Sequence, residues 1–520
     1  MNKIKSLLTA ARLAVLFFIP AISNAQGTKA DAEVLNYRIP VFKRVDENPV
    51  QRVRIFIPGG SLTAKQLVIN TDAASASLID KIRIFNTRNE PVFSGKGIPV
   101  NIQPVAGKNA IPINDTLAPG LNYLWVSVLL KEQAPVDKKV QLSTHTIILS
   151  NGSSLPIRAG NQLEKGWYTG IRIRKPGDDS VNTYRIPGIV RTDKNTLIAV
   201  YDVRYKNDRD LPADIDIGMS RSTDNGETWE PMKIIMSMGK PGENSGIGDP
   251  AVLFDPAGKK IWVAGLWSKG NRSIAGSEPG LSPDVSGQFV LVCSADDGKT
   301  WSAPINITSQ VKNPAWHLYF QGPGNGIAMQ NGTLVFASQY WDETKKPGIP
   351  HGSVIYSMDH GKTWKSGIGA KSNTTESQVI ETTPGTLMLN MRDNRGGFRS
   401  VATTKDMGKT WLEHPTSYEA LPDPVCMASI IKASVKIKGV LREVVFFSNM
   451  NNSDARKHLT IKASLDLGAT WLPAHQLLID ERKAYGYSAL VQVDEETLGV
   501  LYEGIRDLNF VKIPVADIIN

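Results

Sequence analysis

One octapeptide with carboxylate and hydroxyl side chains at fixed spacing occurs five times, at residues 222–229, 294–301, 357–364, 404–411 and 464–471. Three copies contain Gly-Lys-Thr, which resembles the end of a phosphate-binding loop. The first glycine of such a loop is missing, because Cys293, Tyr356 and Thr403 stand in its place. Asp-Asp-Gly at residues 296–298 suggests a calcium loop, but the spaced oxygen ligands and the closing glutamate are absent from the sequence. The repeat is therefore interpreted as structural.

Histidine and cysteine patterns do not indicate a metal site. The seven histidines, at positions 145, 317, 351, 360, 414, 458 and 475, form neither a His-Glu-x-x-His motif nor a close pair. The two cysteines, Cys293 and Cys426, are too few for a disulfide scaffold or a four-cysteine zinc site. Two buried thiols are favoured over a single bridge between them, which the sequence leaves open.

A second motif precedes the first octapeptide: Tyr-Arg-Ile-Pro at residues 184–187, with Arg185 standing 37 residues before Ser222. Arg-Ile-Pro followed by several Asp-containing turns resembles the bacterial exo-sialidases (neuraminidases), whose turns are called Asp boxes. The resemblance covers roughly residues 167–520. It implies a glycosidase that requires no cofactor and no metal.

The resemblance also implies three arginines that grip the carboxylate of sialic acid. Arg185 matches the first, Arg392 the second and Arg456 the third, with Arg442 as a competitor for the third position. A guanidinium suits this task because it is always charged and binds a carboxylate as a planar fork. Glu503 is similar to the family's carboxylate that holds the first arginine.

The nucleophile implied by the family is Tyr487, with Tyr485 as a competitor, and Glu376 is the implied base. Sialidases are an exception among glycosidases in using a tyrosine. The reacting carbon of sialic acid carries a carboxylate, which would repel an attacking carboxylate by several kcal/mol at about 4 Å for an effective dielectric near 20. A neutral phenol avoids this repulsion, but its pKa near 10 makes an adjacent base necessary.

The general acid implied by the family is an aspartate between the first arginine and the first Asp box. Spacing from Arg185 favours Asp210, and Asp208 is the alternative. Asp214 and Asp216 alternate with isoleucines and are interpreted as strand residues.

Two further residues have weaker matches, and one apparent match is dismissed. Arg204 matches an additional substrate contact, and Asp249 matches a residue of the pocket floor near the N-acetyl group. Arg38 lies in a second Tyr-Arg-Ile-Pro, at residues 37–40, but no Asp box follows it for about 180 residues. Arg38 is therefore expected to be an ordinary strand residue.

The elements that must position these residues follow from the repeat. In each copy the aspartate can accept hydrogen bonds from its own turn, and the glycine supplies a positive φ, as in a β-hairpin turn. The copies recur about every 60 residues, which is the size of a four-stranded propeller blade. Residues 165–520 are therefore predicted to form a six-bladed β-propeller in which one blade lacks the turn.

Residues 26–160 contain no copy of the repeat. Strand-like runs at residues 51–57, 78–85, 123–130 and 144–149 predict a β-sandwich, with residues 152–166 as the boundary. The predicted fold class is thus all-β: a β-sandwich followed by a propeller. The sandwich is expected either to bind carbohydrate or to stabilise the propeller by docking.

Residues 1–25 have the pattern of a secretory signal peptide, with a basic start, an apolar run and small residues before Gln26. The protein is therefore expected to be exported to the periplasm or the extracellular space, without a membrane span. The net charge is +9, of which three charges lie in residues 1–25. This mildly basic balance, without a run of Lys or Arg, speaks against nucleic acid and is compatible with an anionic substrate.

The sequence as a whole predicts a monomeric exo-α-sialidase that removes terminal sialic acids from glycans, glycoproteins or glycolipids, with retention through a covalent tyrosyl intermediate. Transfer of the sugar to another glycan, or release of an anhydro product, is an alternative with the same residues. A non-catalytic sialoglycan-binding propeller is the alternative of another class, and it predicts loss of the Tyr, Glu and Asp set.

Overall fold

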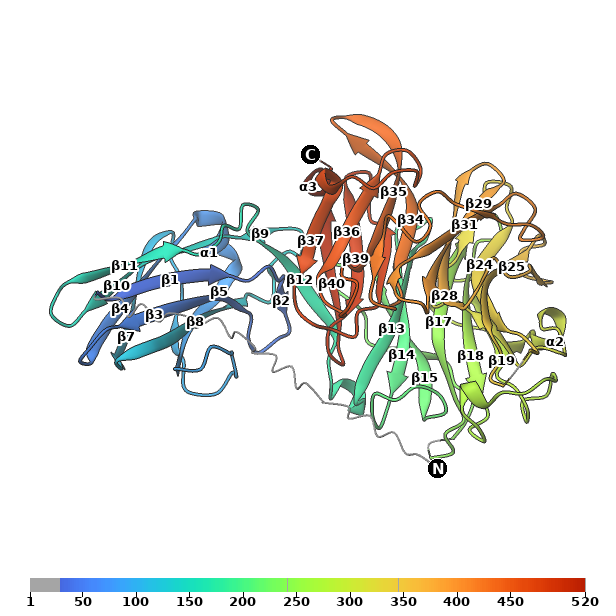
Figure 1. Ribbon diagram of the computed structural model, residues 1–520, viewed down its shortest axis with the longest axis horizontal. Helices are drawn as coiled ribbons and strands as arrows, with labels where there is room; N and C mark the ends of the chain where they lie inside the picture. The colour runs from blue at the N-terminus through green and yellow to red at the C-terminus, as the bar shows by residue number, and fades with distance from the viewer. Residues whose placement is uncertain (1–28, 241, 345, 520) are drawn as a thin grey trace, which may run out of the picture.

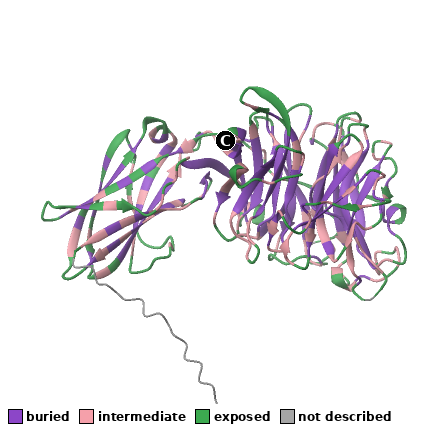
Figure 2. Ribbon diagram, turned by 45° about the horizontal axis from the view of Figure 1, so that its top comes forward, coloured by how far each residue is buried: buried purple, intermediate pink, exposed green. Residues whose placement is uncertain are grey.

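The computed structural model describes residues 29–240, 242–344 and 346–519, so the signal peptide expected at residues 1–25 lies outside the described residues. A smaller β-unit, drawn in blue and cyan, lies beside a larger wheel of sheets (Figure 1). Buried positions concentrate in the strands of the wheel, whereas its connecting loops are mostly exposed (Figure 2). The predicted fold class, a β-sandwich followed by a six-bladed propeller, is confirmed.

The N-terminal sandwich is one continuous path of strands folded over a shared core. The strands, in spatial order, are β6 (Val100–Ile102), β5 (Ile79–Arg88), β8 (Gly120–Leu130), β3 (Pro49–Ile57), β1 (Asp31–Asn36), β11 (Ser154–Ala159), β10 (Leu142–Leu149), β4 (Leu62–Thr71) and β7 (Gly107–Leu117). Inward residues alternate with polar ones, so that Val53 and Ile55 of β3 face Leu67 and Ile69 of β4 across the core. The predicted runs fall in β3, β5, β8 and β10. The expected boundary at residues 152–166 also contains β11.

Six sheets, counted over the described residues, form the propeller. Strands are given from the axis outward. Blade one contains β13 (Thr183–Arg191), β14 (Leu197–Arg204), β15 (Ile215–Ser222) and β16 (Lys233–Met236), and blade two contains β17 (Gly246–Asp255), β18 (Lys260–Ser268), β19 (Gln288–Ser294) and β20 (Ile305–Asn306). Blade three contains β21 (Leu318–Gln321), β24 (Leu334–Trp341), β25 (Pro350–Ser357) and β26 (Lys365–Ser366), blade four contains β28 (Thr374–Thr383), β29 (Thr386–Asp393), β31 (Ser400–Thr404) and β32 (Leu412–Glu413), and blade five contains β34 (Ser429–Ile437), β35 (Val440–Met450), β36 (Leu459–Ser464) and β37 (Gln476–Asp480). Each blade packs its apolar residues against the next blade.

Short strands extend some of these sheets, and short helices lie between strands or after the last one. They are β22 (Gly324–Asn325) beside β17, β23 (Ile327–Ala328) beside β24, β27 (Lys371–Ser372) beside β25, the pair β30 (Gly397–Phe398) and β33 (Pro422–Asp423), and the helices α1 (Ala73–Leu78), α2 (Thr308–Val311) and α3 (Val515–Ile518). In the described part of the chain, no helix has the length and apolar character needed to cross a membrane.

Blade six closes the ring with strands from both ends of the propeller region. It consists of β38 (Ser488–Gln492), β39 (Thr497–Glu503), β40 (Leu508–Pro514) and β12 (Trp167–Arg174). Two strands from the N-terminal region, β2 (Val41–Lys43) and β9 (Lys139–Val140), add to β12. Phe42 of β2 is buried in the core between blades five and six, so the sandwich and the propeller share packed surface.

Arg38 lies between β1 and β2, exposed and outside any strand, so the prediction of a strand residue is wrong. Its carbonyl oxygen accepts a hydrogen bond from the amide of Glu481 in the propeller. The same sequence motif thus forms an ordinary interdomain connection here.

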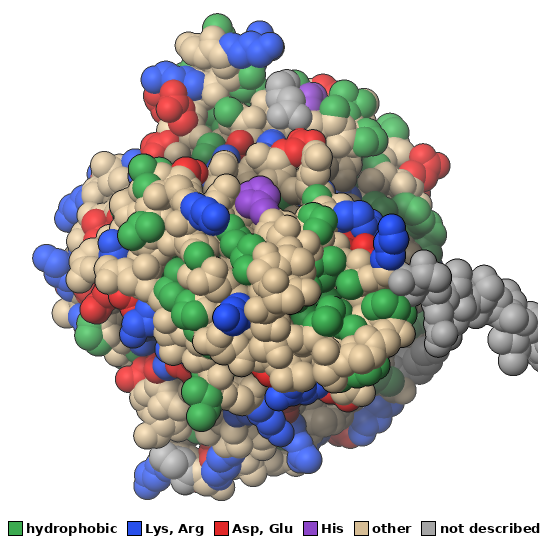
Figure 3. Space-filling view, turned by 90° about the vertical axis from the view of Figure 1, so that its left-hand side faces the viewer, with side chains coloured by type: hydrophobic (Ala, Val, Ile, Leu, Met, Phe, Trp, Pro, Cys, Tyr) green, Lys and Arg blue, Asp and Glu red, His purple; other side chains and the backbone are tan. Residues whose placement is uncertain are grey.

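On the face shown in Figure 3, which is the sandwich end of the molecule, Lys and Arg side chains are interspersed with Asp and Glu.

The five octapeptides form the turns between the third and fourth strands of blades one to five. In the second copy, Asp296 accepts hydrogen bonds from the hydroxyl of Thr300 at 2.6 Å and from its amide at 2.8 Å. Ser294 donates its hydroxyl proton to Asp296 and accepts the amide of Gly298, whose φ is 81°. Blade six has no such hairpin, since its third and fourth strands, β40 and β12, come from opposite ends of the region.

The tryptophan and the glycine of each turn pack between neighbouring blades. Trp229 of blade one meets Phe510 of blade six with ring centroids 5.3 Å apart, and Trp364 of blade three lies 6.1 Å from Trp262 of blade two. A Cβ added to Gly361 would lie 2.2 Å from Trp262. The repeat therefore stabilises the ring as well as the turn.

Substituting Gly361 with alanine should test this role against a matched glycine. Gly361 and Gly385 have φ values of 84° and 78°, but a Cβ on Gly385 would meet nothing within 4 Å. Gly385→Ala should cost about 1–2 kcal/mol for the left-handed backbone. Gly361→Ala should cost about 1–3 kcal/mol more, because the new methyl group overpacks the interface. Urea unfolding measures both, and equal losses would contradict interblade packing by the glycine.

Asp296 should make stability depend on pH. The hydroxyl of Thr300, followed by its amide, lowers the pKa of Asp296 to about 2. Because this pKa is depressed, the stabilisation is present above about pH 4 and is lost as pH falls towards 2. Asp296→Asn should therefore be less stable than the wild type at pH 7, and the difference should shrink towards pH 2. A difference that stays constant over this range in urea unfolding would contradict the assignment.

Candidate active site

A cavity of about 330 Å³ opens at one end of the propeller axis, where the innermost strands begin. Its lining includes the predicted residues Arg185, Asp210, Asp249, Glu376, Arg392, Arg456 and Tyr487. These residues come from five blades. Four of them lie in or directly before innermost strands, whereas Asp210, Arg392 and Arg456 lie in second strands or in the loops that follow them. Arg204 and Glu503 lie behind this lining, buried against Asp210 and Arg185.

Irregular backbone aims three of these side chains into the cavity. The pairing register shifts between Arg185 and Gly188 in β13, between Gly248 and Ala251 in β17, and between Thr374 and Ser377 in β28. Such bulges redirect side chains at the ends of strands. Ile186 has a φ of 57°, which is strained for a β-branched residue and points to a functional constraint.

Glu503 binds the first arginine and two backbone amides. Its fully buried carboxylate accepts Nε of Arg185 at 3.1 Å, the amide of Ile186 at 2.8 Å and the amide of Tyr487 at 3.0 Å. Four charge-assisted donors, counting the second nitrogen of Arg185 at 3.5 Å, compensate the buried charge. Glu503 thereby fixes Arg185 and Tyr487 relative to each other.

Tyr487 lies at the centre of the cluster. Its hydroxyl donates to Glu376, with both carboxylate oxygens at 2.6 and 2.7 Å, and accepts from Arg392 at 3.0 Å. Arg392 also forms an ion pair with Glu376. Burial, followed by the charge of Glu376, raises the pKa of Tyr487 well above its usual value, while Arg392 and Arg185 act in the opposite direction. The resting group is therefore a neutral phenol against a base.

Arg185 and Arg456 flank the ring of Tyr487, with guanidinium carbons 5.3 and 5.8 Å from its centroid. Arg456 donates to the carbonyl oxygens of Tyr485 and Val425 at 3.0 and 2.9 Å. Among the described residues, no carboxylate lies within ion-pair distance of Arg456, so its charge is available to an anionic ligand. Arg442, its competitor in the sequence, is exposed near the start of β35 and lies outside the cavity lining.

Asp210 is presented on the exposed loop between β14 and β15. Its side chain is 78% exposed and lies 2.7 Å from Arg204 and 3.5 Å from Arg185. Arg204 is 2% exposed and pairs with Asp202 through two nitrogens, at 2.8 and 3.1 Å. Arg204 thus supports Asp210 from behind, whereas the sequence suggested a direct substrate contact. The pairing of Asp202 with Arg204 had no signal in the sequence.

Tyr485 and Asp208, the alternatives that the sequence left open for the nucleophile and the general acid, form a hydrogen bond with each other. The hydroxyl of Tyr485 donates to Asp208 at 2.7 Å, and its ring lies 4.7 Å from the guanidinium carbon of Arg185. Asp216 lies in β15 as predicted, while Asp214 precedes that strand and accepts the amides of residues 242 and 244.

Asp249 lies on the cavity floor with a φ of 56°. Burial, followed by the charges of Asp202 and Glu376, raises its pKa well above the usual value, which favours the neutral acid. Near it, an apolar wall consists of residues that the sequence did not single out, namely Leu211, Ile274, Phe320 and Trp341. Gln339 also lines the cavity and had no sequence signal.

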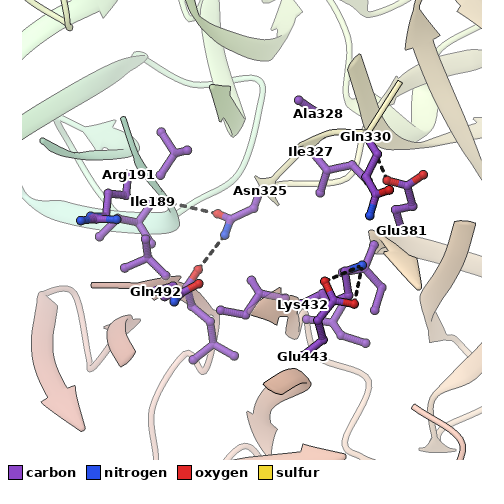
Figure 4. Close-up of a pocket in the computed structure, with 17 residues that line it drawn as sticks. Ile189, Arg191, Asn325, Ile327, Ala328, Gln330, Glu381, Lys432, Glu443 and Gln492 are labelled. Atoms are coloured by element: carbon purple, nitrogen blue, oxygen red, sulfur yellow. Dashed lines mark hydrogen bonds and ion pairs between the residues drawn. The ribbon is translucent and has the colours of Figure 1, made fainter. Parts of the chain in front are cut away.

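A second cavity lies at the opposite ends of the same innermost strands (Figure 4). There Asn325 accepts the amide of Ile189 at 3.0 Å and donates to the carbonyl of Leu490 at 2.8 Å. Lys432 pairs with Glu443 at 3.4 Å. Gln330 likewise donates its amide to Glu381 at 2.8 Å, so several polar groups of this second cavity are held by their neighbours.

The structure places neither cysteine in a disulfide: Cys293 is half-buried, and Cys426 is buried beneath Tyr487. In the part of the chain that is described, no group of three or more His, Cys, Asp or Glu side chains is arranged to hold a metal ion. The first cavity combines a phenol with a base, an exposed carboxyl group and three guanidinium groups. This set can perform nucleophilic and acid–base chemistry on a carboxylated substrate.

Comparisons with known proteins agree with this chemistry. Residues 193–500 match the BNR repeat-like domain, and residues 29–153 match the N-terminal domain of BNR-repeat neuraminidase. A sialidase of Bacteroides fragilis is 46% identical over 412 residues, covering 78% of this chain and 75% of the relative. A sialidase of Micromonospora viridifaciens is 31% identical and covers 66% of this chain and 54% of the relative. The structure of Hadza microbial sialidase Hz136 has a TM-score of 0.87 at 38% identity, covering 94% of this chain and 100% of that one. The chain therefore belongs to the sialidase (neuraminidase) family of glycoside hydrolases.

Proposed function

We propose that this protein is a retaining exo-α-sialidase that releases terminal sialic acid through a covalent tyrosyl intermediate. The observation that carries the proposal is the hydroxyl of Tyr487, held by both oxygens of Glu376 and surrounded by three arginines. The substrates would be sialylated glycans, glycoproteins or glycolipids. The carboxylate of the sugar would bind Arg185, Arg392 and Arg456.

In the first step, the oxygen of Tyr487 attacks the anomeric carbon while its proton passes to Glu376. The bond to the leaving oxygen breaks, and Asp210 gives that oxygen a proton. Arg392 and Arg185 lower the cost of the developing phenolate, because they are the cations that depress the pKa of Tyr487. Arg392 is already in hydrogen-bond contact with the phenol oxygen.

In the second step, Asp210 is a carboxylate and takes a proton from water. The water oxygen bonds to the anomeric carbon, the bond to Tyr487 breaks, and Glu376 returns the proton to the phenolate. Two inversions give net retention. The 78% exposure of Asp210 supports this role, because its carboxyl group must reach both the leaving oxygen and solvent.

Transfer to another glycan, or release of an anhydro product, would use the same first step and differ in what attacks the intermediate. No described feature favours either outcome over hydrolysis. A non-catalytic sialoglycan-binding propeller is disfavoured by the hydrogen bond between Tyr487 and Glu376, which carbohydrate binding alone does not require.

The basic, apolar and small-residue pattern of residues 1–25 supports export to the periplasm or the extracellular space. For the N-terminal domain, stabilisation of the propeller is supported by the burial of Phe42 between blades five and six. Both assignments belong to this proposal.

The reaction class can be tested with a fluorogenic sialoside followed by proton NMR. Free sialic acid should appear first as the α-anomer and then mutarotate, because two inversions preserve the configuration. Initial appearance of the β-anomer would contradict the covalent mechanism. An anhydro sugar or a transfer product would favour the alternatives, and no turnover on any linkage would favour the binding module.

The nucleophile can be tested by covalent labelling with a fluorinated sialic acid that carries a good leaving group. The wild type should be labelled on Tyr487, as should Tyr485→Phe, whereas Tyr487→Phe should bind sialic acid without being labelled. Glu376→Gln should slow labelling by about 10²–10⁴-fold, since the phenol loses its base. Peptide mapping of the adduct to Tyr485 or to Glu376 would contradict the mechanism.

A further inference from the structure

The loop between β14 and β15, residues 205–214, must hold Asp210 at a defined distance from Tyr487. The side chain of Asp210 is mostly exposed, so packing alone does not fix it. Leu211 anchors the loop in the apolar wall, and Arg204 donates to the carbonyl oxygen of Asp208 at 2.7 Å. Leu211 and Arg204 both belong to blade one, whereas Tyr487 belongs to blade six.

One hydrogen bond connects this loop to blade six. The hydroxyl of Tyr485 donates to Oδ2 of Asp208 at 2.7 Å, across 277 residues of sequence. Asp208 is two residues before Asp210, and Tyr485 is two residues before Tyr487. The contact therefore joins the segment of the general acid to the segment of the nucleophile.

Tyr485 is itself fixed from several sides. Its amide donates to the carbonyl oxygen of Gly504 at 3.0 Å, and its carbonyl oxygen accepts from Arg456 at 3.0 Å. Its ring lies 4.7 Å from the guanidinium carbon of Arg185, within the range of a cation–π contact. The hydroxyl is thus presented to Asp208 by a residue whose backbone is held by Arg456 and whose ring is held by Arg185.

We infer that Tyr485 and Asp208 form a latch that positions Asp210 over the bond to be cleaved. The latch rests on the proposed function, because it assigns these two positioning residues to the general acid of that mechanism. Neither residue belongs to the lining of the cavity. A phenol donating to a carboxylate forms a charge-assisted hydrogen bond, which is stronger than a neutral one and suits a contact on an exposed loop.

The predicted consequence is selective for the leaving group. A sugar hydroxyl leaves poorly without a proton, whereas an acidic phenol leaves with little help. A displaced Asp210 should therefore slow cleavage of sialyllactose much more than cleavage of a nitrophenyl sialoside. A general defect in folding or in carboxylate binding would slow both substrates by the same factor.

The test compares Tyr485→Phe, Asp208→Asn and the double variant with the wild type. For each single variant, kcat/KM should fall about 10–100-fold on sialyllactose and less than about 3-fold on the nitrophenyl sialoside, a partial loss of the 10²–10⁴-fold that acid catalysis supplies. The double variant should lose no more than either single variant, because the two groups act as one pair.

Tyr205→Phe is the matched control. The hydroxyl of Tyr205 donates to Asp216 at 2.8 Å, so this variant also loses a bond from a phenol to a carboxylate at the same loop, but within blade one. Its ratio of kcat/KM on the two substrates should equal that of the wild type. Hydrogen exchange gives a second readout without turnover: the amides of residues 206–211 should exchange faster in Tyr485→Phe than in the wild type.

Three outcomes would overturn the latch: equal losses on both substrates, no loss on sialyllactose, or unchanged exchange of the loop amides. Failure of the proposed function gives a different result, because the wild type would then release no sialic acid from either substrate. If the wild type releases no sialic acid but the loop amides still exchange faster in Tyr485→Phe, the hydrogen bond between Tyr485 and Asp208 is only a structural contact. That result would overturn its proposed role in positioning a general acid.

Discussion

The buried carboxylate of Glu503 is the interaction on which the rest of the site depends. It lies on β39 of blade six, yet it binds Arg185 and the amide of Ile186, which belong to blade one. It also accepts the amide of Tyr487, directly before β38. A fully buried carboxylate is costly unless its oxygens are satisfied, so removing any of these donors would leave charge uncompensated. The interaction thus closes the ring and fixes Arg185 beside Tyr487.

Ring closure explains why residues more than 300 positions apart form one site. Blade six combines the last strands of the chain with β12. Glu503 of this blade binds Arg185 of blade one and thereby bridges the seam between blades six and one near the axis. The Asp-box turns act at the periphery, where Trp229 inserts against Phe510 across this seam. The seam is therefore held at the rim by apolar packing and at the axis by charge. Strained backbone at Ile186 is tolerated because both neighbouring blades constrain it.

The sequence could predict what is local or repeated. The Asp boxes specify turns through contacts between neighbouring residues, so their period yields the blades, and the resemblance supplies Arg185, Glu376 and Tyr487. The sequence could not predict pairs that form only in three dimensions. Arg204 matched a substrate contact, but its burial against Asp202 and Asp210 follows from how blade one packs. Arg38 is flanked in the sequence by the same three residues as Arg185. It nevertheless lies at an interdomain connection, because no propeller blade follows it directly. The addition of β2 to blade six depends on a pairing across more than 120 residues.

The charges around Tyr487 show why the site suits an anionic sugar. Arg185 and Arg392 are each paired with a carboxylate, whereas Arg456 donates to two neutral carbonyl oxygens. The raised pKa of Asp249 favours its neutral form, which keeps the floor from adding negative charge. Among the described residues, Arg456 is therefore the arginine of the cavity lining whose charge has no carboxylate partner, and it lies beside a neutral phenol. A carboxylate entering the cavity would be attracted to Arg456 without being repelled by the neutral phenol of Tyr487. The same substrate would meet repulsion if the attacking group were itself a carboxylate, and this is the physical reason why the proposed nucleophile is a tyrosine.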